Sequence, residues 1–551
     1  MPPATPFRRA DMLDRLESES YDVLVIGGGI TGTGVALDAA ARGLRTALVE
    51  RDDFASGTSS KSSKLVHGGL RYLQQGEIRL VYEALRERER LCKNAPHLVK
   101  VLPFMIPILT RDGVVSRKIA RAMGSAMWMY DLTGGWRIGK MHRRLKKDAA
   151  FSHLPTMPKD RLASAYLYFD ATVDDARLCL TVARTAADHG ATVVNRCRVV
   201  ELTKNDDGRA SGAVVDASGR LITVRAKVIV NAAGVWSDEV RTLDEGADPD
   251  SIRPAKGVHI TVPWEKVRND IAVVIPVPKD KRSLFVVPWG RRADGTFEHA
   301  YIGTTDTDYN GSIDDPQCSK DDITYVLRAL NASITTGVTE ADITGVWAGL
   351  RPLVKSASSG RTADLSRRHK VNRSTSNLIT VTGGKLTTYR EMAQDTVDEV
   401  CEVLGVRRKS TTRRLPLFGA AGYRQPADDA AHLANRYGTA AGDVVALHGA
   451  DVRLGEPLVP GLPYTKAEAV YAARSEMAVT LDDVLSRRTR ARLFDRPATV
   501  QAAEAVARLI APDMGWDDAE VERQVLEFRT SCAAEQTAGQ TSEADLLGVH
   551  R

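Results

Sequence analysis

Short apolar runs that end in glycine or another small residue recur along this chain. The first, Val-Leu-Val-Ile at residues 23–26, leads directly into a Gly-x-Gly-x-x-Gly turn at residues 27–32. A second run, at residues 46–49, ends at Glu50. A buried strand, a glycine turn, a helix and a second strand with a terminal acid are, in this order, typical of a dinucleotide-binding βαβ unit. The pattern therefore predicts a dinucleotide site near the start of the chain.

The residues of this unit have separate expected roles. Gly27 permits the tight turn, Gly29 lets the backbone approach a pyrophosphate, and Gly32 lets the helix pack on the strand. The N-terminus of the helix then faces the diphosphate. Glu50 can accept hydrogen bonds from both ribose hydroxyls of an adenosine, whereas its carboxylate would repel a 2′-phosphate. NADP is therefore disfavoured.

The rest of the pattern alternates between the periods of strands and helices. A polar, small-residue loop at 58–72 precedes a charged helix at 78–94 and an apolar run at 101–109 that contains Pro103 and Pro107. Because proline is barred from central strands, we expect this run at a sheet edge. Further strands are predicted at 192–200, 211–215, 221–224, 228–230, 258–262, 272–276, 284–287, 300–303 and 378–381, and helices at 175–189, 389–404, 427–437, 465–480, 481–493 and 499–510.

A chain of 551 residues is too long for one typical core. Small-residue turns near 234 and 383 suggest that later strands return to the dinucleotide, so the nucleotide domain is expected to be discontinuous. We predict a nucleotide domain from residues 20–100, 173–250 and 351–404, an antiparallel substrate domain from 101–172 and 251–350, a linker at 405–426, a helical domain at 427–532 and a flexible tail at 533–551.

The composition excludes several classes of protein. The chain is 43% hydrophobic and 26% charged, as in ordinary globular proteins, and its net charge of +6 (76 − 70) gives no indication of nucleic-acid binding. No apolar run reaches the roughly 18 to 20 residues of a membrane-spanning helix, and residues 1–20 lack the apolar core of a secretory signal. The 6 cysteines include no Cys-x-x-Cys pair, so no metal site or redox dithiol is indicated. We expect a cytoplasmic protein.

The segment 117–147 is compatible with contact to a membrane surface. It alternates basic and apolar residues and ends in a basic run at 143–147. Four apolar residues recur at helical spacing, namely Ile119, Met123, Met127 and Tyr130. Such a pattern is typical of an interfacial amphipathic element. The same pattern favours a partly buried helix followed by a solvated basic loop, and membrane contact stays open as the alternative.

Four glycine-containing segments, near residues 27, 68, 234 and 383, are expected to converge on one ligand. A nicotinamide cofactor needs fewer, so FAD fits better. The turn Gly383-Gly384-Lys385 at a helix start would place backbone N–H groups near a flavin pyrimidine ring, where negative charge gathers on reduction.

Three cations lie beside these loops in the sequence: Arg71, Arg351 and Lys385. A guanidinium matches a phosphate or carboxylate bidentately, and an ammonium adds a point charge. We therefore expect an anionic substrate. His259 is the candidate to take a hydroxyl proton, because the ordinary pKa of histidine is about 6.5.

Seven motifs now stand in order within residues 20–400, at 27–32, 62–72, 173–178, 256–259, 302–306, 349–353 and 383–390. Together they closely resemble the FAD-dependent glycerol-3-phosphate dehydrogenases, and the helices after residue 410 resemble the bacterial respiratory branch of that family. The resemblance implies an α/β fold with a glutathione-reductase-like, Rossmann-type FAD-binding domain, an antiparallel-sheet substrate domain and an all-helical C-terminal domain.

The resemblance also implies the reaction. Sn-glycerol 3-phosphate would be oxidised to dihydroxyacetone phosphate by hydride transfer from C2 to flavin N5, and the electrons would leave for a membrane quinone. Members of the family lie on the inner face of the cell membrane as peripheral proteins, usually as dimers. We therefore expect a homodimer attached to the membrane surface there.

On this basis, Arg71, Arg351 and Lys385 would hold the phosphate or polarise the reacting oxygen, and His259 would be the base. Tyr72 and Thr388 would add hydrogen bonds to the substrate. Relatives commonly carry threonine where this chain has Ala233, a departure expected to change little. The expected FAD contacts are Gly27, Gly28, Gly29, Ile30, Thr31, Gly32, Glu50, Ser59, Ser60, Lys64, Leu65, His67, Gly68, Gly69, Val199, Ala233, Gly234, Gly384, Lys385, Leu386 and Thr387.

Three other functions stay open at this stage. A glycerol-3-phosphate oxidase would share the half-reaction and reduce O₂ to H₂O₂, but the extra insertion expected in its substrate region is not seen. A non-catalytic, FAD-binding redox module at the membrane would not need the three cations and His259 together. An amine or amino-acid oxidase would need only a single arginine to bind the carboxylate of its substrate, whereas this chain has three cations.

Overall fold

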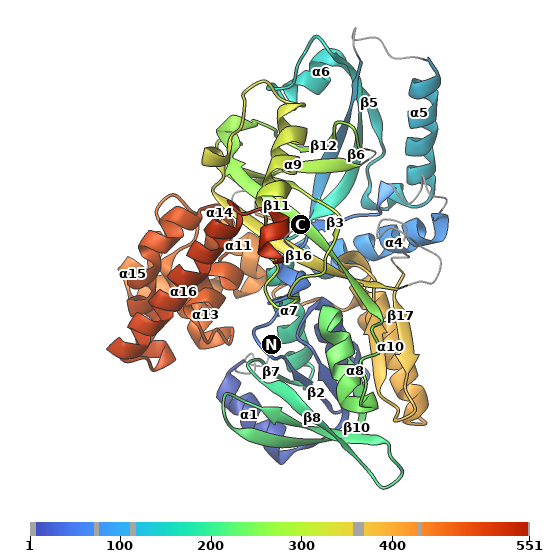
Figure 1. Cartoon of the computed structure of the whole chain (residues 1–551), viewed down its shortest axis with the longest axis vertical. Helices are drawn as coiled ribbons and strands as arrows, with labels where there is room; N and C mark the ends of the chain where they lie inside the picture. Colours follow the sequence, from blue (N-terminus) through green and yellow to red (C-terminus); the bar gives the residue numbers. More distant parts are fainter. Residues whose placement is uncertain are drawn as a thin grey trace.

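Two large sheets and a cluster of helices make up the fold (Figure 1). The computed structural model describes residues 7–70, 77–110, 117–280, 282–355, 368–426 and 431–548, with the backbone alone at 117–123. In Figure 1 the first sheet lies in the lower half, the second in the upper half, and the C-terminal helices on the left. The chain passes between the two sheets several times, so neither sheet is a continuous segment.

The first sheet has a parallel centre in the order β18, β10, β1, β2, β7. Residues 23–25 at its middle are fully buried, which explains why these strands are continuous apolar runs rather than alternating ones. Antiparallel pairing adds β17 beside β18, β9 beside β10 and β8 beside β9. The strands are β1 (Ser20–Ile26), β2 (Thr46–Val49), β7 (Thr192–Val194), β8 (Arg198–Lys204), β9 (Ala210–Asp216), β10 (Leu221–Asn231), β17 (Lys370–Arg373) and β18 (Ile379–Thr382).

Three helices cover this sheet as one layer. α2 (Ile30–Ala41) packs between α7 (Asp175–Asp188) and α10 (Tyr389–Val403). Two shorter helices flank the sheet, α1 (Arg9–Ser18) and α8 (Ser237–Glu245). The strands and helices of this sheet thus come from three separate parts of the chain.

The second sheet runs in the order β15, β11, β14, β13, β12, β4, β6, β3, with β16 on β11 and β5 on β6. Its pairs are antiparallel except β12 with β4. α9 (Lys320–Asn331) and α6 (Lys147–Ser152) join one hydrophobic cluster of the sheet, and α4 (Ile78–Asn94) and α5 (Arg117–Leu132) join another. The strands are β3 (Leu65–Val66), β4 (Lys100–Leu109), β5 (Arg143–Lys146), β6 (Leu162–Thr172), β11 (Ile252–Pro263), β12 (Ala272–Pro276), β13 (Ser283–Arg291), β14 (Phe297–Gly303), β15 (Thr307–Asp308) and β16 (Gly345–Val354).

The C-terminal helices are α11 (His432–Tyr437), α12 (Ala441–Ala450), α13 (Lys466–Ser475), α14 (Ala491–Phe494), α15 (Arg496–Met514) and α16 (Asp518–Ala538). α13 to α16 share one hydrophobic core, and α11 and α12 pack with α13 in a second, smaller one. Thr465 and Glu468 form the predicted capping box of α13, and Gly438 ends α11 with a φ of +60°. Among the described residues, no helix combines the length and apolar character needed to cross a bilayer.

We expected the proline-containing run at 101–109 to lie at a sheet edge, but it lies inside the sheet. On one side, β4 pairs along its whole length with β6. On the other side, it pairs with β12 over a short stretch. The overlap with β12 is confined to Phe104 and Met105, so it requires no hydrogen bond from either Pro103 or Pro107. A short parallel contact therefore lets a strand with two prolines occupy an interior place.

Two predicted elements are interrupted. The strand expected at 192–200 is divided into β7 and β8, because Arg196 adopts a φ of +51° and its side chain pairs with Asp483 of the helical domain at 2.8 Å. The helix expected at 481–493 consists of a π-helix (Asp483–Arg488) and α14, separated by Arg490 with a φ of +86°. Conversely, the strands expected at 221–224 and 228–230 are one strand, β10.

The predicted flexible tail is partly structured. α16 continues to Ala538, and a short helix, α17 (Glu543–Leu546), then packs on the substrate sheet. Glu543 forms an ion pair with the buried Lys256 of β11, and the amide of Lys320 donates to the carbonyl of Thr541 at 2.9 Å. Lys256 also pairs with Asp322 at 2.7 Å, so Glu543 is the second carboxylate beside this buried ammonium, and the ion pair and the backbone hydrogen bond together attach the tail to the substrate sheet.

The segment 117–147 was expected to be either a partly buried helix or a membrane contact. The described residues of its helically spaced apolar face agree with the partly buried helix. Met127 and Tyr130 are buried in the cluster under β4 and β6. The side chains of Ile119 and Met123 lie outside the described residues. The opposite face of α5 carries exposed aromatic and aliphatic side chains, which the spacing of the first four residues did not indicate.

Candidate active site

A cavity of about 1230 Å³ is lined by the carboxyl ends of the first sheet and by strands of the second. This volume exceeds that of most small-molecule pockets. β1, β2 and β10 contribute their last residues or the turns that follow them, and β11, β13 and β16 contribute side chains from the other side. Ligands of open α/β sheets bind at this carboxyl edge.

One end of the cavity is built for a diphosphate. Gly27 has a φ of +112°, and a Cβ there would lie 2.6 Å from the carbonyl oxygen of Ala232. A Cβ on Gly32 would overlap the carbonyl oxygen of Gly27, so the turn tolerates neither side chain. α2 begins at Ile30 with no acidic residue in its first turn. The positive end of α2 therefore faces the cavity with no carboxylate within its own first turn.

Glu50 lies beside this turn at the end of β2. Its carboxylate accepts hydrogen bonds from the amides of Gly28 at 2.6 Å and Asp52 at 2.8 Å. Burial raises the pKa of Glu50 to about 7, although these two hydrogen bonds oppose the shift. The oriented carboxyl group lines the cavity, where ribose hydroxyls would replace the solvation it has lost.

The glycine turn after β18 lines another part of the same cavity. Gly384, Lys385, Leu386 and Thr387 face it at the start of α10. The hydroxyl of Thr387 accepts a hydrogen bond from the amide of His67 at 3.2 Å, which joins this turn to the loop before α4. Two glycine turns, each followed by a helix start, thus line the same cavity, which fits the diphosphate and the flavin of FAD.

His259 reaches the cavity from β11. It is 2% exposed, stacks on Trp347 with ring centroids 4.8 Å apart, and its Nε2 lies 2.9 Å from Oγ of Ser63. Burial lowers the pKa of His259 well below its ordinary value, and the charges of Lys64 and Arg351 lower it further. The imidazole is therefore neutral at physiological pH and able to accept a proton.

Arg351 enters from β16, the neighbour of β11. Its guanidinium donates to a carboxylate oxygen of Asp306 at 3.1 Å and to the hydroxyl of Thr304 at 3.0 Å. A Cβ on Gly257 would lie 2.5 Å from Nη2 of Arg351, so the glycine provides the space that the guanidinium occupies. The fork is held rigidly at the cavity wall, where it presents fixed positive charge.

Most of the predicted contacts line this one cavity. They are Gly27, Gly29, Ile30, Thr31, Glu50, Ser59, Leu65, His67, Gly69, Val199, Ala233, Gly234, His259, Arg351, Gly384, Lys385, Leu386 and Thr387. These residues come from parts of the chain that are far apart in sequence, and the fold brings them together.

Six predicted contacts lie behind the cavity wall instead. Gly28 holds Glu50, Gly32 packs on Gly27, and the amide of Gly68 donates to Asp170 at 3.2 Å. Ser60, Lys64 and Thr388 are buried, with Lys64 paired to Asp175 at 3.0 Å. Arg71 and Tyr72 lie outside the described residues.

Several lining residues were not predicted as contacts. Ser63, Thr304 and Asp306 stand inside motifs that the sequence singled out, but no local pattern indicated that they hold His259 and Arg351. Arg282 lines the cavity and donates to the carbonyl of Asp306 at 2.7 Å, and Trp236 lines it with its ring under the guanidinium of Arg51. Neither has a sequence signal, because their positions depend on packing between the two sheets.

Comparison with known proteins agrees with this geometry. Residues 22–390 match the family model for FAD dependent oxidoreductases, and residues 387–521 match that for the C-terminal domain of alpha-glycerophosphate oxidase. Glycerol-3-phosphate dehydrogenase 2 of Mycobacterium tuberculosis is 41% identical over 98% of this chain and 94% of its own length.

Two solved structures extend the comparison. The glycerol-3-phosphate dehydrogenase of Bacillus halodurans, complexed with FAD, superposes with a TM-score of 0.75 at 30% identity, covering 95% of this chain and 97% of that one. The L-alpha-glycerophosphate oxidase of Mycoplasma pneumoniae, with FAD bound, shares the fold at a TM-score of 0.53 and 16% identity, covering 71% and 97%. The glycine turns, the helix starts and the long cavity fit FAD as the cofactor. By sequence and by fold, the chain belongs to the family of FAD-dependent glycerol-3-phosphate dehydrogenases.

Proposed function

We propose that this chain oxidises sn-glycerol 3-phosphate to dihydroxyacetone phosphate and passes the electrons to a membrane quinone. The observation that carries the proposal is the cavity, which joins a dinucleotide turn to a wall bearing Arg351, Lys385 and His259. Two cations suit a substrate with a doubly charged phosphate, and a neutral imidazole suits the loss of a hydroxyl proton. The identity of 41% to a glycerol-3-phosphate dehydrogenase supports the same substrate.

Each residue has a role in this proposal. Arg351 and Lys385 bind the phosphate or stabilise the charge that develops on the C2 oxygen, and Thr388 supports Lys385 from behind through the carbonyl of that residue, at 3.4 Å. His259 takes the C2 hydroxyl proton at Nε2, the nitrogen beside Ser63. FAD, when bound, supplies the two-electron acceptor for the hydride of C2. Arg71 and Tyr72 are proposed to complete the phosphate site.

The quinone acceptor would be reached at the inner face of the cell membrane, where the chain would lie as a peripheral homodimer. A surface formed by α5, the residues after it and β5 supports the membrane contact. Trp128, Leu132 and Trp136 are 54%, 75% and 55% exposed, and Arg143 and Arg144 are exposed beside them on β5. Exposed tryptophans with flanking basic residues are typical of interfacial membrane contact.

The first expected result is bleaching of the flavin. Anaerobic addition of glycerol 3-phosphate to the purified yellow protein should abolish the flavin absorbance band at about 450 nm, because hydride transfer reduces FAD. Glycerol is the control, since it lacks the phosphate that the cations bind. Failure to bleach would exclude the substrate. Reoxidation by a soluble quinone with little peroxide formation supports the dehydrogenase, whereas rapid peroxide formation in air would favour the oxidase.

Arg351→Ala should raise the KM for glycerol 3-phosphate at least about tenfold, because a charged hydrogen-bonding partner of the phosphate is lost. Bound FAD should stay stoichiometric, as measured by absorbance after gel filtration. Arg253→Ala is the matched control: this arginine lies on the neighbouring strand and pairs with Asp308 at 2.7 Å, outside the cavity lining. Equal KM values for the two variants would remove Arg351 from the substrate site.

His259→Asn should slow flavin reduction by roughly 10²- to 10⁴-fold, the usual contribution of a general base. In the wild type, stopped-flow reduction should keep its rate as the pH falls below 6.5, since the pKa of His259 lies well below that value and the neutral form persists. The rate should fall only when the pH reaches the lowered pKa. An unchanged rate in the variant would assign the base to another group.

Replacing Trp128 and Trp136 together by serine should weaken binding to anionic vesicles at least about tenfold, because burial of each large side chain contributes roughly 1.5 to 3 kcal/mol. Co-flotation with liposomes measures the effect. Leu526→Ser is the control, since this residue is 66% exposed on the distant α16. Reduction by glycerol 3-phosphate should be unaffected in both proteins. Equal flotation of both would place the membrane contact elsewhere.

A further inference from the structure

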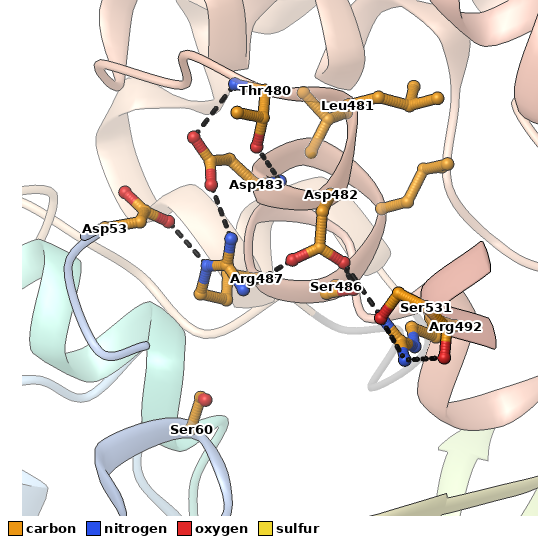
Figure 2. Close-up of polar contacts among 12 residues, drawn as sticks. Asp53, Ser60, Thr480, Leu481, Asp482, Asp483, Ser486, Arg487, Arg492 and Ser531 are labelled. Carbon is orange, nitrogen blue, oxygen red and sulfur yellow. Dashed lines mark hydrogen bonds and ion pairs between the residues drawn. The ribbon is translucent and has the colours of Figure 1, made fainter. Parts of the chain in front are cut away.

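The C-terminal helical domain meets the FAD domain through a set of buried charges. Figure 2 shows one half of this junction, in which Arg487 of the π-helix reaches Asp53, Asp482 and Asp483, with Ser60 on the adjoining loop. Arg488 adds two bonds to Asp53, at 2.7 and 2.8 Å. Asp53 follows β2 and does not line the cavity. This half of the junction fastens the two domains to each other.

The other half of the junction is centred on Arg490. Its side chain is 1% exposed, and its backbone is in the left-handed region with a φ of +86°. One guanidinium nitrogen donates both to the carbonyl of Ser60 at 2.6 Å and to the carboxylate of Asp175 at 2.9 Å. Arg490 thus bonds directly to the loop at 58–64 and to the start of α7.

The carboxylate of Asp175 accepts further hydrogen bonds from the same loop. One carboxylate oxygen accepts from the amide of Ser62 at 3.0 Å and from its hydroxyl at 2.7 Å. The other accepts from Nζ of Lys64 at 3.0 Å, in addition to Arg490. Both Asp175 and Lys64 are fully buried. The position of the loop is therefore tied to one carboxylate that two cations share.

The loop in turn contacts the proposed base. Ser63 lies 2.9 Å from Nε2 of His259, and the carbonyl of Ser62 accepts from Nε1 of Trp347 at 3.1 Å. Trp347 stacks on His259 at 4.8 Å, and Nζ of Lys64 lies 4.6 Å from the Trp347 ring centroid. His259 is thus bounded on one edge and on one ring face by groups that the loop orients.

We propose that Arg490, a residue of the C-terminal domain that does not line the cavity, is a positioning residue for the reaction centre. It holds Asp175 and Ser60, and through them sets the loop that orients His259 and Trp347. Without Arg490, Asp175 would keep one buried cation instead of two, and the Ser60 carbonyl would lose a charged donor. The loop would shift, and small displacements of a catalytic group cost large factors in rate. This inference rests on the proposed function.

The test compares Arg490→Gln with Arg487→Gln as holoenzymes, by anaerobic stopped-flow reduction with glycerol 3-phosphate. Arg490→Gln should lower the limiting rate of flavin reduction roughly 10- to 100-fold, while the substrate Kd changes less than about threefold, because Arg351 and Lys385 are untouched. Arg487→Gln disturbs the same junction without touching the loop and should keep a rate within about threefold of the wild type. Arg490→Lys should recover part of the rate, since it restores the charge but not the two-partner geometry.

Each outcome separates the possibilities. If the wild type is not reduced by glycerol 3-phosphate, the proposed function fails. If the wild type is reduced and Arg490→Gln matches it, or if both glutamine variants slow equally in step with loss of FAD and of thermal stability, the positioning role is overturned. Should Arg490→Gln not yield holoenzyme, Ser62→Ala carries the test: it keeps the ion pairs but removes the hydroxyl that ties the loop to Asp175. A wild-type rate in that variant overturns the proposal, and a rate lowered by roughly three- to tenfold with FAD retained supports it.

Discussion

Buried carboxylates of the FAD domain require cations that the domain itself does not fully supply. Asp53, Asp174 and Asp175 are buried, and each pairs with an arginine of the C-terminal helices: Asp53 with Arg488, Asp174 with Arg436 and Asp175 with Arg490. A buried charge that loses its partner is strongly destabilising. The helical domain is therefore an integral part of the nucleotide domain's interior. Because ion pairs of this kind demand fixed geometry, they also hold the two domains in one relative orientation.

This constraint extends to the site. The loop at 58–64 has too many polar groups and too few apolar ones to hold its own shape. It lies between the first turn of α7, the substrate sheet and the C-terminal domain, and each supplies hydrogen bonds to it. The cavity wall at this point is thus built by three parts of the chain that are distant in sequence. A loop organised in this way can present Ser63 to His259, although only Thr58–Ser60 at its start form a turn of 3-10 helix.

Local signals account for the elements that the sequence predicted well. The helix at 78–94 and the strand at 272–276 have the predicted bounds, and the capping box at Thr465 is present, because in each case the decisive pattern lies within a few residues. The interior place of β4 could not be predicted, since it depends on the short overlap with β12, far along the chain. The break at Arg490 has no local signal either. Its left-handed backbone is accompanied by partners at Ser60 and Asp175, more than 300 residues away.

The residues of the site likewise fall into those that a local pattern predicted and those that depend on distant contacts. The glycine turn and Glu50 line the cavity as predicted, because a turn and an acid that follow two neighbouring parallel strands at a characteristic spacing meet at one edge of the sheet. His259 and Arg351 were recognisable as residue types beside cofactor loops. Their surroundings were not, because the stack of Trp347 on His259 and the pair of Arg351 with Asp306 arise from the pairing of β16 with β11 and from β14, not from spacing.

The discontinuity of the first sheet has a consequence for synthesis. β1 begins at Ser20, but β18, which pairs with Val230 and Asn231 at the end of β10, ends only at Thr382. A ribosome that adds about 5 to 20 residues per second needs roughly 20 to 80 s to reach that point. During part of this time, the newly made chain carries the end of β10, Val230 and Asn231, with one unpaired edge. Exposed strand edges of this kind recruit other chains, so a nascent or truncated chain that stops before β18 is a natural client for chaperones.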